Sequence, residues 1–140
     1  MSGATREQVV KEALEWVGTP FHDMAGIKGV GTDCAHLVKG AFVNTGMIED
    51  FSPQYKPQWF QHRDEPRFLL ALADRGAHKI DVKDVLPGDV LMYRFGRHAA
   101  HGAIVVDANT IVHAYKPVGH VCLGSRREFE DRLDSAWSLF

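Results

Sequence analysis

Apolar residues recur at the spacing of an α-helix in three parts of the chain, and helix start and stop signals flank them. Thr5 and Gln8 have the Thr-x-x-Gln spacing of a capping box, and Gly18-Thr19-Pro20 stops the helix that they open. A second helix follows Asp33, a good N-cap residue, and ends before Gly46. The positions expected to face the core are Val9, Val10, Ala13, Leu14 and Val17 in the first helix, Leu37, Val38, Ala41 and Phe42 in the second, and Phe68, Leu69 and Leu72 in a third over residues 66–75.

The second half of the chain changes to the two-residue period of β-strands. The strands that this pattern predicts cover about 89–95, 101–107, 110–116 and 119–123. Residues 126–133 are typical of a last short helix, and 136–140 form an apolar tail that either packs on the core or docks to a partner. Helices that precede an antiparallel sheet indicate the α+β class. Because no linker or repeat divides the chain, we predict a single domain over residues 1–140.

Two segments lack a regular period. Residues 18–33 hold four glycines and predict a loop that leads to Cys34. Residues 51–66 contain prolines that exclude a continuous helix. This second segment either packs its aromatic side chains on the core or forms a wall of a substrate groove, since aromatic residues line many clefts.

Composition narrows the classes of protein that fit. A hydrophobic content of 45 % and a charged content of 24 % are ordinary for a soluble globular protein. A net charge of -2 argues against a general nucleic-acid surface. No apolar run reaches the roughly 18 residues of a membrane span, so we expect no membrane insertion. Arg94, Arg97 and His98 form the one basic cluster, which we interpret as a solvated loop.

Cys34 stands where a helix N-terminus can act on its thiol. The unpaired N–H groups and the positive end of the helix dipole favour a thiolate, and such positions lower a cysteine pKa to roughly 3.5–7.5. The alternative is that Cys34 is a small buried hydrophobe. The only other cysteine, Cys122, alternates with His120 on a predicted strand, and we expect it to be buried without chemistry.

Two histidines supply the partners that a nucleophilic cysteine needs. If Asp107-Ala108-Asn109 forms a three-residue turn, His113 lies opposite Ala103 and His101 is its diagonal neighbour on the same face. A two-residue turn would instead put the histidines on opposite faces. The first register allows a nucleophile, a base and a group that orients the base.

The order of four motifs resembles the NlpC/P60 family of papain-like cysteine peptidases. These motifs are Gly31-Thr32-Asp33-Cys34 with Leu37 and Val38, Leu86-Pro87-Gly88-Asp89-Val90, His101-Gly102-Ala103-Ile104-Val105, and Ile111-Val112-His113-Ala114. The resemblance implies a papain-like fold with Cys34 as nucleophile, His101 as base and His113 as the orienting residue. It also implies cleavage of the peptide stem of peptidoglycan, commonly between D-glutamate and a diamino acid.

The chain departs from this family pattern at two places near the site. Many members carry serine and glycine after the cysteine, where the serine helps to hold a substrate carboxylate, but here these residues are Ala35 and His36. Members also tend to place a tyrosine twelve or thirteen residues before the cysteine, where its hydroxyl helps the oxyanion site, and here the residues are Phe21 and His22. We therefore take His22, Asp33, Phe21 and His36 as further candidates for substrate or oxyanion contacts.

A metal site is the alternative use of the eight histidines. His98, His101 and His113 could supply ligands, but the sequence has no His-Glu-x-x-His and no Cys-x-x-Cys motif. We therefore expect neither a metal nor a cofactor.

The resemblance extends to a branch of the family that is carried by phage tails and gene transfer agents. The opening Trp16-Val17-Gly18-Thr19-Pro20-Phe21 and the lead-in Gly29-Val30-Gly31 are similar to that branch. Residues 1–8 lack the apolar region of a signal peptide, so we expect synthesis in the cytoplasm and delivery to a cell wall on a phage-like particle, with tail tip or hub proteins as partners. Two alternatives stay open: an inactive structural tail subunit, and a thiol amidase or acyltransferase on the same fold.

Overall fold

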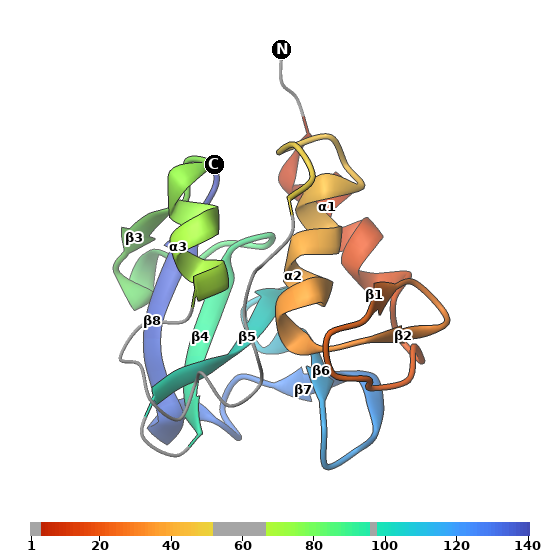
Figure 1. The fold of residues 1–140 in the computed structure, drawn as a ribbon. Helices are drawn as coiled ribbons and strands as arrows, with labels where there is room; N and C mark the ends of the chain where they lie inside the picture. Colours follow the sequence, from red (N-terminus) through yellow and green to blue (C-terminus); the bar gives the residue numbers. More distant parts are fainter. Residues whose placement is uncertain (1–3, 52–66, 96–97) are drawn as a thin grey trace.

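A six-stranded antiparallel sheet in the order β3-β8-β4-β5-β6-β7 organises the chain (Figure 1). The computed structural model describes residues 4–51, 67–95 and 98–140. The strands are β3 (His78–Ile80), β4 (Val90–Phe95), β5 (His98–Val105), β6 (Thr110–Tyr115), β7 (His120–Ser125) and β8 (Leu133–Ser138). Helices α1 (Arg6–Leu14), α2 (Cys34–Val43) and α3 (Arg67–Asp74) cover one face of this sheet. The expected α+β class is confirmed.

Helix α1 begins as its sequence predicts but faces the core differently. Thr5 and Gln8 form the expected capping box. Val9, Ala13 and Trp16 are buried, whereas Leu14 and Val17 are exposed, so the expected inward stripe is wrong at these two residues. The α-helix ends at Leu14, so helical spacing does not extend to Val17, and the indole of Trp16 fills the core in its place.

Helices α2 and α3 bury the predicted residues. Leu37, Val38, Ala41 and Phe42 are fully buried in α2, which ends before Gly46 as expected. Gly40 leaves space for the indole of Trp16, because a Cβ there would lie 2.4 Å from Cζ2 of Trp16. In α3, Leu69 and Leu72 are buried, while the side chain of Phe68 lies outside the described part of the structure.

Four strands of the sheet correspond to predicted ones, whereas the sequence pattern does not predict β3 and β8, which lie at one end of the sheet. Strands β4, β6 and β7 lie within or close to the predicted ranges, and β5 begins three residues earlier than expected. The expected helix over 126–133 is wrong: this segment holds only the short 3-10 turn η3 (Glu130–Arg132). The apolar tail is not a free end, because Leu133–Ser138 forms strand β8 between β3 and β4. A second 3-10 turn, η2 (Val82–Asp84), connects β3 to β4.

Both faces of the sheet are buried, which explains the long apolar run of β4. The helices pack on one face, against Val90, Met92, Ile104 and Val112 among others. The opposite face has its own cluster, formed by Leu91, Tyr93, Ala103, Val105, Ile111, Phe129 and Ala136. His101 and His113 lie on this second face, because they alternate in phase with Ala103 and Ile111.

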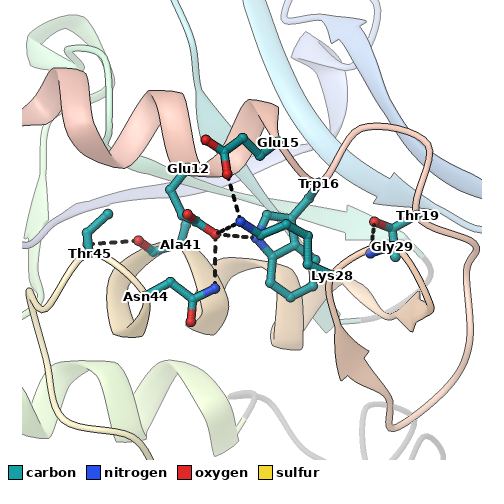
Figure 2. A network of polar contacts seen from close by, with 9 residues as sticks. All are labelled: Glu12, Glu15, Trp16, Thr19, Lys28, Gly29, Ala41, Asn44 and Thr45. Atoms are coloured by element: carbon teal, nitrogen blue, oxygen red, sulfur yellow. Dashed lines mark hydrogen bonds and ion pairs between the residues drawn. The ribbon is translucent and has the colours of Figure 1, made fainter.

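The glycine-rich segment over 18–33 contains a small hairpin, of strands β1 (Gly26–Ile27) and β2 (Gly31–Thr32). Figure 2 shows how Lys28, between these strands, binds α1: its Nζ lies 2.8 Å from Oε2 of Glu12 and 2.8 Å from Oε1 of Glu15. The same Glu12 oxygen accepts hydrogen bonds from Nε1 of Trp16 and Nδ2 of Asn44. This network fixes the hairpin to both helices, and the hairpin leads directly into Cys34.

Of the irregular segment over residues 51–66, the structure describes only Phe51. Phe51 packs at the edge of the helical core with the guanidinium of Arg75 4.2 Å from its ring centroid. The remainder of the irregular segment, 52–66, lies outside the described residues.

Within the described residues, no helix has the length and apolar character to cross a membrane.

Candidate active site

Asp33 and Cys34 form the junction between the hairpin and α2. Asp33 is the N-cap, as predicted, and its Oδ1 accepts hydrogen bonds from the backbone N–H of His36 at 2.9 Å and faces Nδ1 of the same residue at 2.8 Å. Its Oδ2 accepts the N–H of Met24, whose φ of 66° is the only positive value at a non-glycine residue in the described chain. One carboxylate thus holds both the helix start and the turn before the hairpin.

The Cys34 thiol lies against strand β5. The backbone N–H groups of Gly102, Ala35 and Cys34 itself interact favourably with the ionised sulfur and act to lower its pKa. Burial and the negative charge of Asp33 outweigh them and raise the pKa of Cys34 to about 12. The expected low pKa is therefore wrong for this structure, and the resting form of the residue is the thiol.

His101 and His113 form a direct hydrogen bond. Strands β5 and β6 pair Ile104 with Val112 and Val105 with Ile111, which is the register of the three-residue turn. Nε2 of His101 lies 2.8 Å from Nδ1 of His113, and the ring centroids are 5.0 Å apart. Gly102, whose N–H interacts with the Cys34 sulfur, directly follows His101 in the chain. The structure therefore joins His101 directly to His113 and places the start of α2 beside the strand that carries His101.

Aromatic side chains enclose the histidine pair on the second face of the sheet. Tyr115 is stacked on His113 with 5.0 Å between centroids and 11° between planes, and Phe129 meets His113 edge-on at 5.5 Å. The ring of Phe95 lies 5.0 Å from that of His101. No motif in the sequence singles out these residues, although Phe95 and Tyr115 follow the alternating period of their strands.

This enclosure keeps both imidazoles neutral at neutral pH. Burial, together with the charge of His113, lowers the pKa of His101 to about 3. Burial alone lowers the pKa of His113 to about 4. A neutral pair that shares a hydrogen bond has one donor and one acceptor between the rings. When Nε2 of His101 donates, its Nδ1 is left with a lone pair that can accept a proton.

The structure places the other candidates around the start of α2. The imidazole of His36 is bound to Asp33 and packs on Gly26, where a Cβ would lie 2.8 Å from its Cδ2. Phe21 is half-buried against the helical core, and its N–H donates to the carbonyl of Gly119. The side chain of His22 is exposed. Phe21 therefore serves as a packing residue in this structure.

The other potential metal-ligating side chains do not form a metal site in the described structure. No three His, Cys, Asp or Glu side chains within residues 4–51, 67–95 and 98–140 are grouped so as to hold a metal ion. Within the described residues, neither Cys34 nor Cys122 is part of a disulfide. Cys122 is half-buried and directly opposite His113 on β7, where burial and the charge of Glu128 raise its pKa.

Comparison with protein families and solved structures places this geometry among known folds. The model of the NlpC/P60 family matches residues 18–131. A comparison with curated protein sequences finds no match. The NlpC/P60 domain of the peptidoglycan hydrolase SagA aligns at 21 % identity with a TM-score of 0.69, over 96 % of this chain and 99 % of that domain.

Two further structures share the fold over part of their length. NlpC2 from Trichomonas vaginalis aligns at 17 % identity with a TM-score of 0.71, over 99 % of this chain and 49 % of that one. The peptidoglycan hydrolase RipB from Mycobacterium tuberculosis aligns at 18 % identity with a TM-score of 0.68, over 96 % of this chain and 64 % of that one. The chain thus spans the whole SagA domain and about half to two thirds of these two structures. At these identities the likeness is one of fold.

Proposed function

This chain belongs to the NlpC/P60 family, and we propose that it is a cysteine peptidase that hydrolyses stem peptides of bacterial peptidoglycan. One observation carries the proposal: the Cys34 thiol at the start of α2 interacts with the N–H of Gly102, next to a histidine that is hydrogen-bonded to a second histidine. The likeness to the NlpC/P60 domain of the peptidoglycan hydrolase SagA and to the peptidoglycan hydrolase RipB supports the choice of substrate.

In the proposed reaction, Cys34 and His101 share one proton. As the sulfur attacks the carbonyl carbon of the scissile bond, the thiol proton moves to Nδ1 of His101. His101 then gives this proton to the leaving amine, so the C–N bond breaks and a thioester remains on Cys34. A water molecule hydrolyses the thioester, and His101 takes a proton from this water and returns it to the sulfur.

The neutral resting state decides how the nucleophile forms. Because burial raises the pKa of Cys34 to about 12 and lowers that of His101 to about 3, a thiolate–imidazolium pair is not the resting form. Proton transfer therefore accompanies attack on the substrate. In the tautomer that the reaction requires, Nε2–H of His101 donates to Nδ1 of His113 across their 2.8 Å contact, which keeps the lone pair of His101 Nδ1 available for the thiol proton.

Mass spectrometry of purified muropeptides tests the proposal. Hydrolysis adds the mass of one water per cut and creates a new amine and a new carboxyl group, and fragmentation locates the cut bond. Incubation with an added amine separates hydrolysis from acyl transfer, because an acyltransferase would join the amine to the peptide. Unchanged masses with several stem types would favour the inactive structural subunit.

We further propose that the protein acts as part of a phage-like particle that penetrates a cell wall, with tail tip or hub proteins as its partners. The support is the similarity of the segment 16–21 and of Gly29-Val30-Gly31 to the branch of the family carried by such particles. An attached enzyme would gain a high effective concentration at the point of contact with the wall. Proteomics of purified particles tests this: the protein should co-purify with tails, and its presence in host cytosol alone would refute it.

A further inference from the structure

Strand β7 approaches the ring of His113 where its sequence has a glycine. The pairing of β6 with β7 sets Cys122 opposite His113 and Gly124 opposite Ile111. A Cβ on Gly124 would lie 2.8 Å from Nε2 of His113, 3.4 Å from Cε1 and 3.5 Å from Cδ2. These three atoms form the outer edge of the imidazole, so the glycine leaves space for that edge.

Backbone conformation does not account for this glycine. Among the described residues, six glycines have positive φ values, which side chains rarely adopt, and Gly124 is not one of them. Glycine in the interior of a strand costs stability, because it adds backbone entropy to the unfolded chain and packs no side chain. The glycine at position 124 is therefore explained by the close approach of strand β7 to the imidazole of His113.

The ring of His113 has little room to move away from a Cβ at position 124. Tyr115 is stacked on one face of the ring, and Phe129 contacts it edge-on. Nδ1, on the other side of the ring from Cδ2, is engaged by His101 at 2.8 Å. Only 1 % of His113 is exposed to solvent, so a displaced ring would have to push into packed side chains or rotate away from His101.

We propose that Gly124 is a positioning residue: the absence of a side chain at this point fixes the His113 imidazole with Nδ1 directed at Nε2 of His101. The effect of Gly124 on catalysis rests on the proposed function, in which His113 orients His101. A methyl group at position 124 shifts or turns the His113 ring and separates the two nitrogens. The base then loses its fixed tautomer and orientation while Cys34 and His101 are both still present.

The variant Gly124→Ala tests this proposal, with Leu123→Ala as the matched control in the same strand. Leu123 is 53 % exposed, so its truncation leaves His113 untouched. With muropeptide as substrate, Gly124→Ala should lower kcat about ten- to a hundred-fold with little change in KM, because small misplacements of catalytic groups cost up to about a hundred-fold. Leu123→Ala should stay within about two-fold of the wild type, as surface substitutions usually do.

Two readouts that do not depend on activity separate positioning from simple loss of stability. In ¹⁵N-histidine-labelled protein, Gly124→Ala should change the ring nitrogen shifts of His101 and His113, and Leu123→Ala should not. In urea unfolding, Gly124→Ala should lower the midpoint in the wild-type background and not in His113→Ala, where the methyl group fills space that the imidazole has left. The double variant keeps the test decisive if the single variant does not fold.

The outcomes distinguish this proposal from the proposed function. Wild-type ring shifts in Gly124→Ala, or equal loss of stability in both backgrounds, would overturn the role of Gly124. If the wild-type protein cleaves no muropeptide while the ring shifts and the unfolding cycle behave as expected, the peptidase assignment fails and the positioning of His113 by Gly124 stands.

Discussion

His101 and His113 lie on neighbouring strands with Nε2 of the first 2.8 Å from Nδ1 of the second. This contact engages one nitrogen of each ring and leaves Nδ1 of His101 and Nε2 of His113 outside it. Because aromatic rings surround the pair, water does not compete for the hydrogen bond. In the proposed reaction, Nδ1 of His101 takes the thiol proton and His113 orients His101 through this contact.

The two histidines should differ in how much activity depends on them. His101→Ala removes the acceptor of the thiol proton, and a general base is typically worth about 10²–10⁴ in rate. His113→Ala should cost less, roughly ten- to a hundred-fold, because water can replace part of an orienting contact. Turnover of muropeptides by both variants measures this order. An active His101→Ala beside an inactive His113→Ala would exchange the roles.

In the pH profile of kcat/KM, the acid limb should lie at an unusually low pH. His101 must be neutral to accept a proton, and burial lowers its pKa from an ordinary 6.5 to about 3. kcat/KM should therefore stay high below pH 5, where an ordinary histidine would be protonated. Phe95→Ala opens the ring of His101 to water and should move the limb toward higher pH. A wild-type limb between pH 6 and 7 would contradict the enclosed, neutral base.

The same histidines should make folding stability depend on pH. Their pKa values are lower in the folded protein than in the unfolded chain, so below about pH 6.5 the unfolded state binds more protons. The stabilisation present above pH 6.5 is lost as the pH falls toward 4 and below. Urea unfolding at several pH values measures it, and the double alanine variant of His101 and His113 should show a flatter dependence. Parallel curves of unfolding free energy against pH for the two proteins would argue against the lowered histidine pKa values.

Glu12 should contribute more to stability than its neighbour Glu15. Burial disfavours its ionised form, but hydrogen bonds from Asn44, Lys28 and Trp16 prevail and hold the pKa of Glu12 below its usual range. Glu12→Ala leaves the indole N–H of the buried Trp16 without its acceptor, which should cost about 1–3 kcal/mol of unfolding free energy. Glu15→Ala removes a half-exposed ion pair and should cost about 0–1 kcal/mol. Urea unfolding checks the order, and equal losses would contradict it.

Predictions from the sequence are most accurate where residues close together in the chain determine the local structure. The capping box at Thr5 and the N-cap at Asp33 depend on residues three positions away, and both occur as predicted. The histidine pair depends on the length of the turn at Asp107-Ala108-Asn109, which the sequence leaves open and which the structure shows to be three residues. Nearby residues therefore determine much of what places Cys34, His101 and His113 in the fold.

Contacts between distant segments account for the errors. Strand β8 escapes prediction because Ser135 and Ser138 are buried within it, which hides its alternation. The pKa of Cys34 rises because β5 and the core cover the thiol, and no local pattern reports that burial. Phe129 reaches His113 from the turn before η3, in a segment whose sequence predicts a helix.

The most direct test of the account compares the wild-type protein with Cys34→Ala on purified muropeptides, with circular dichroism to show that both are folded. The wild type should release peptides with one added water per cut, and Cys34→Ala should release none, because no other group in the proposed reaction can form the thioester. Cys34→Ser should be nearly inactive, since the hydroxyl is far harder to ionise than the thiol. Wild-type rates from folded Cys34→Ala would contradict the assignment of this site as a cysteine peptidase.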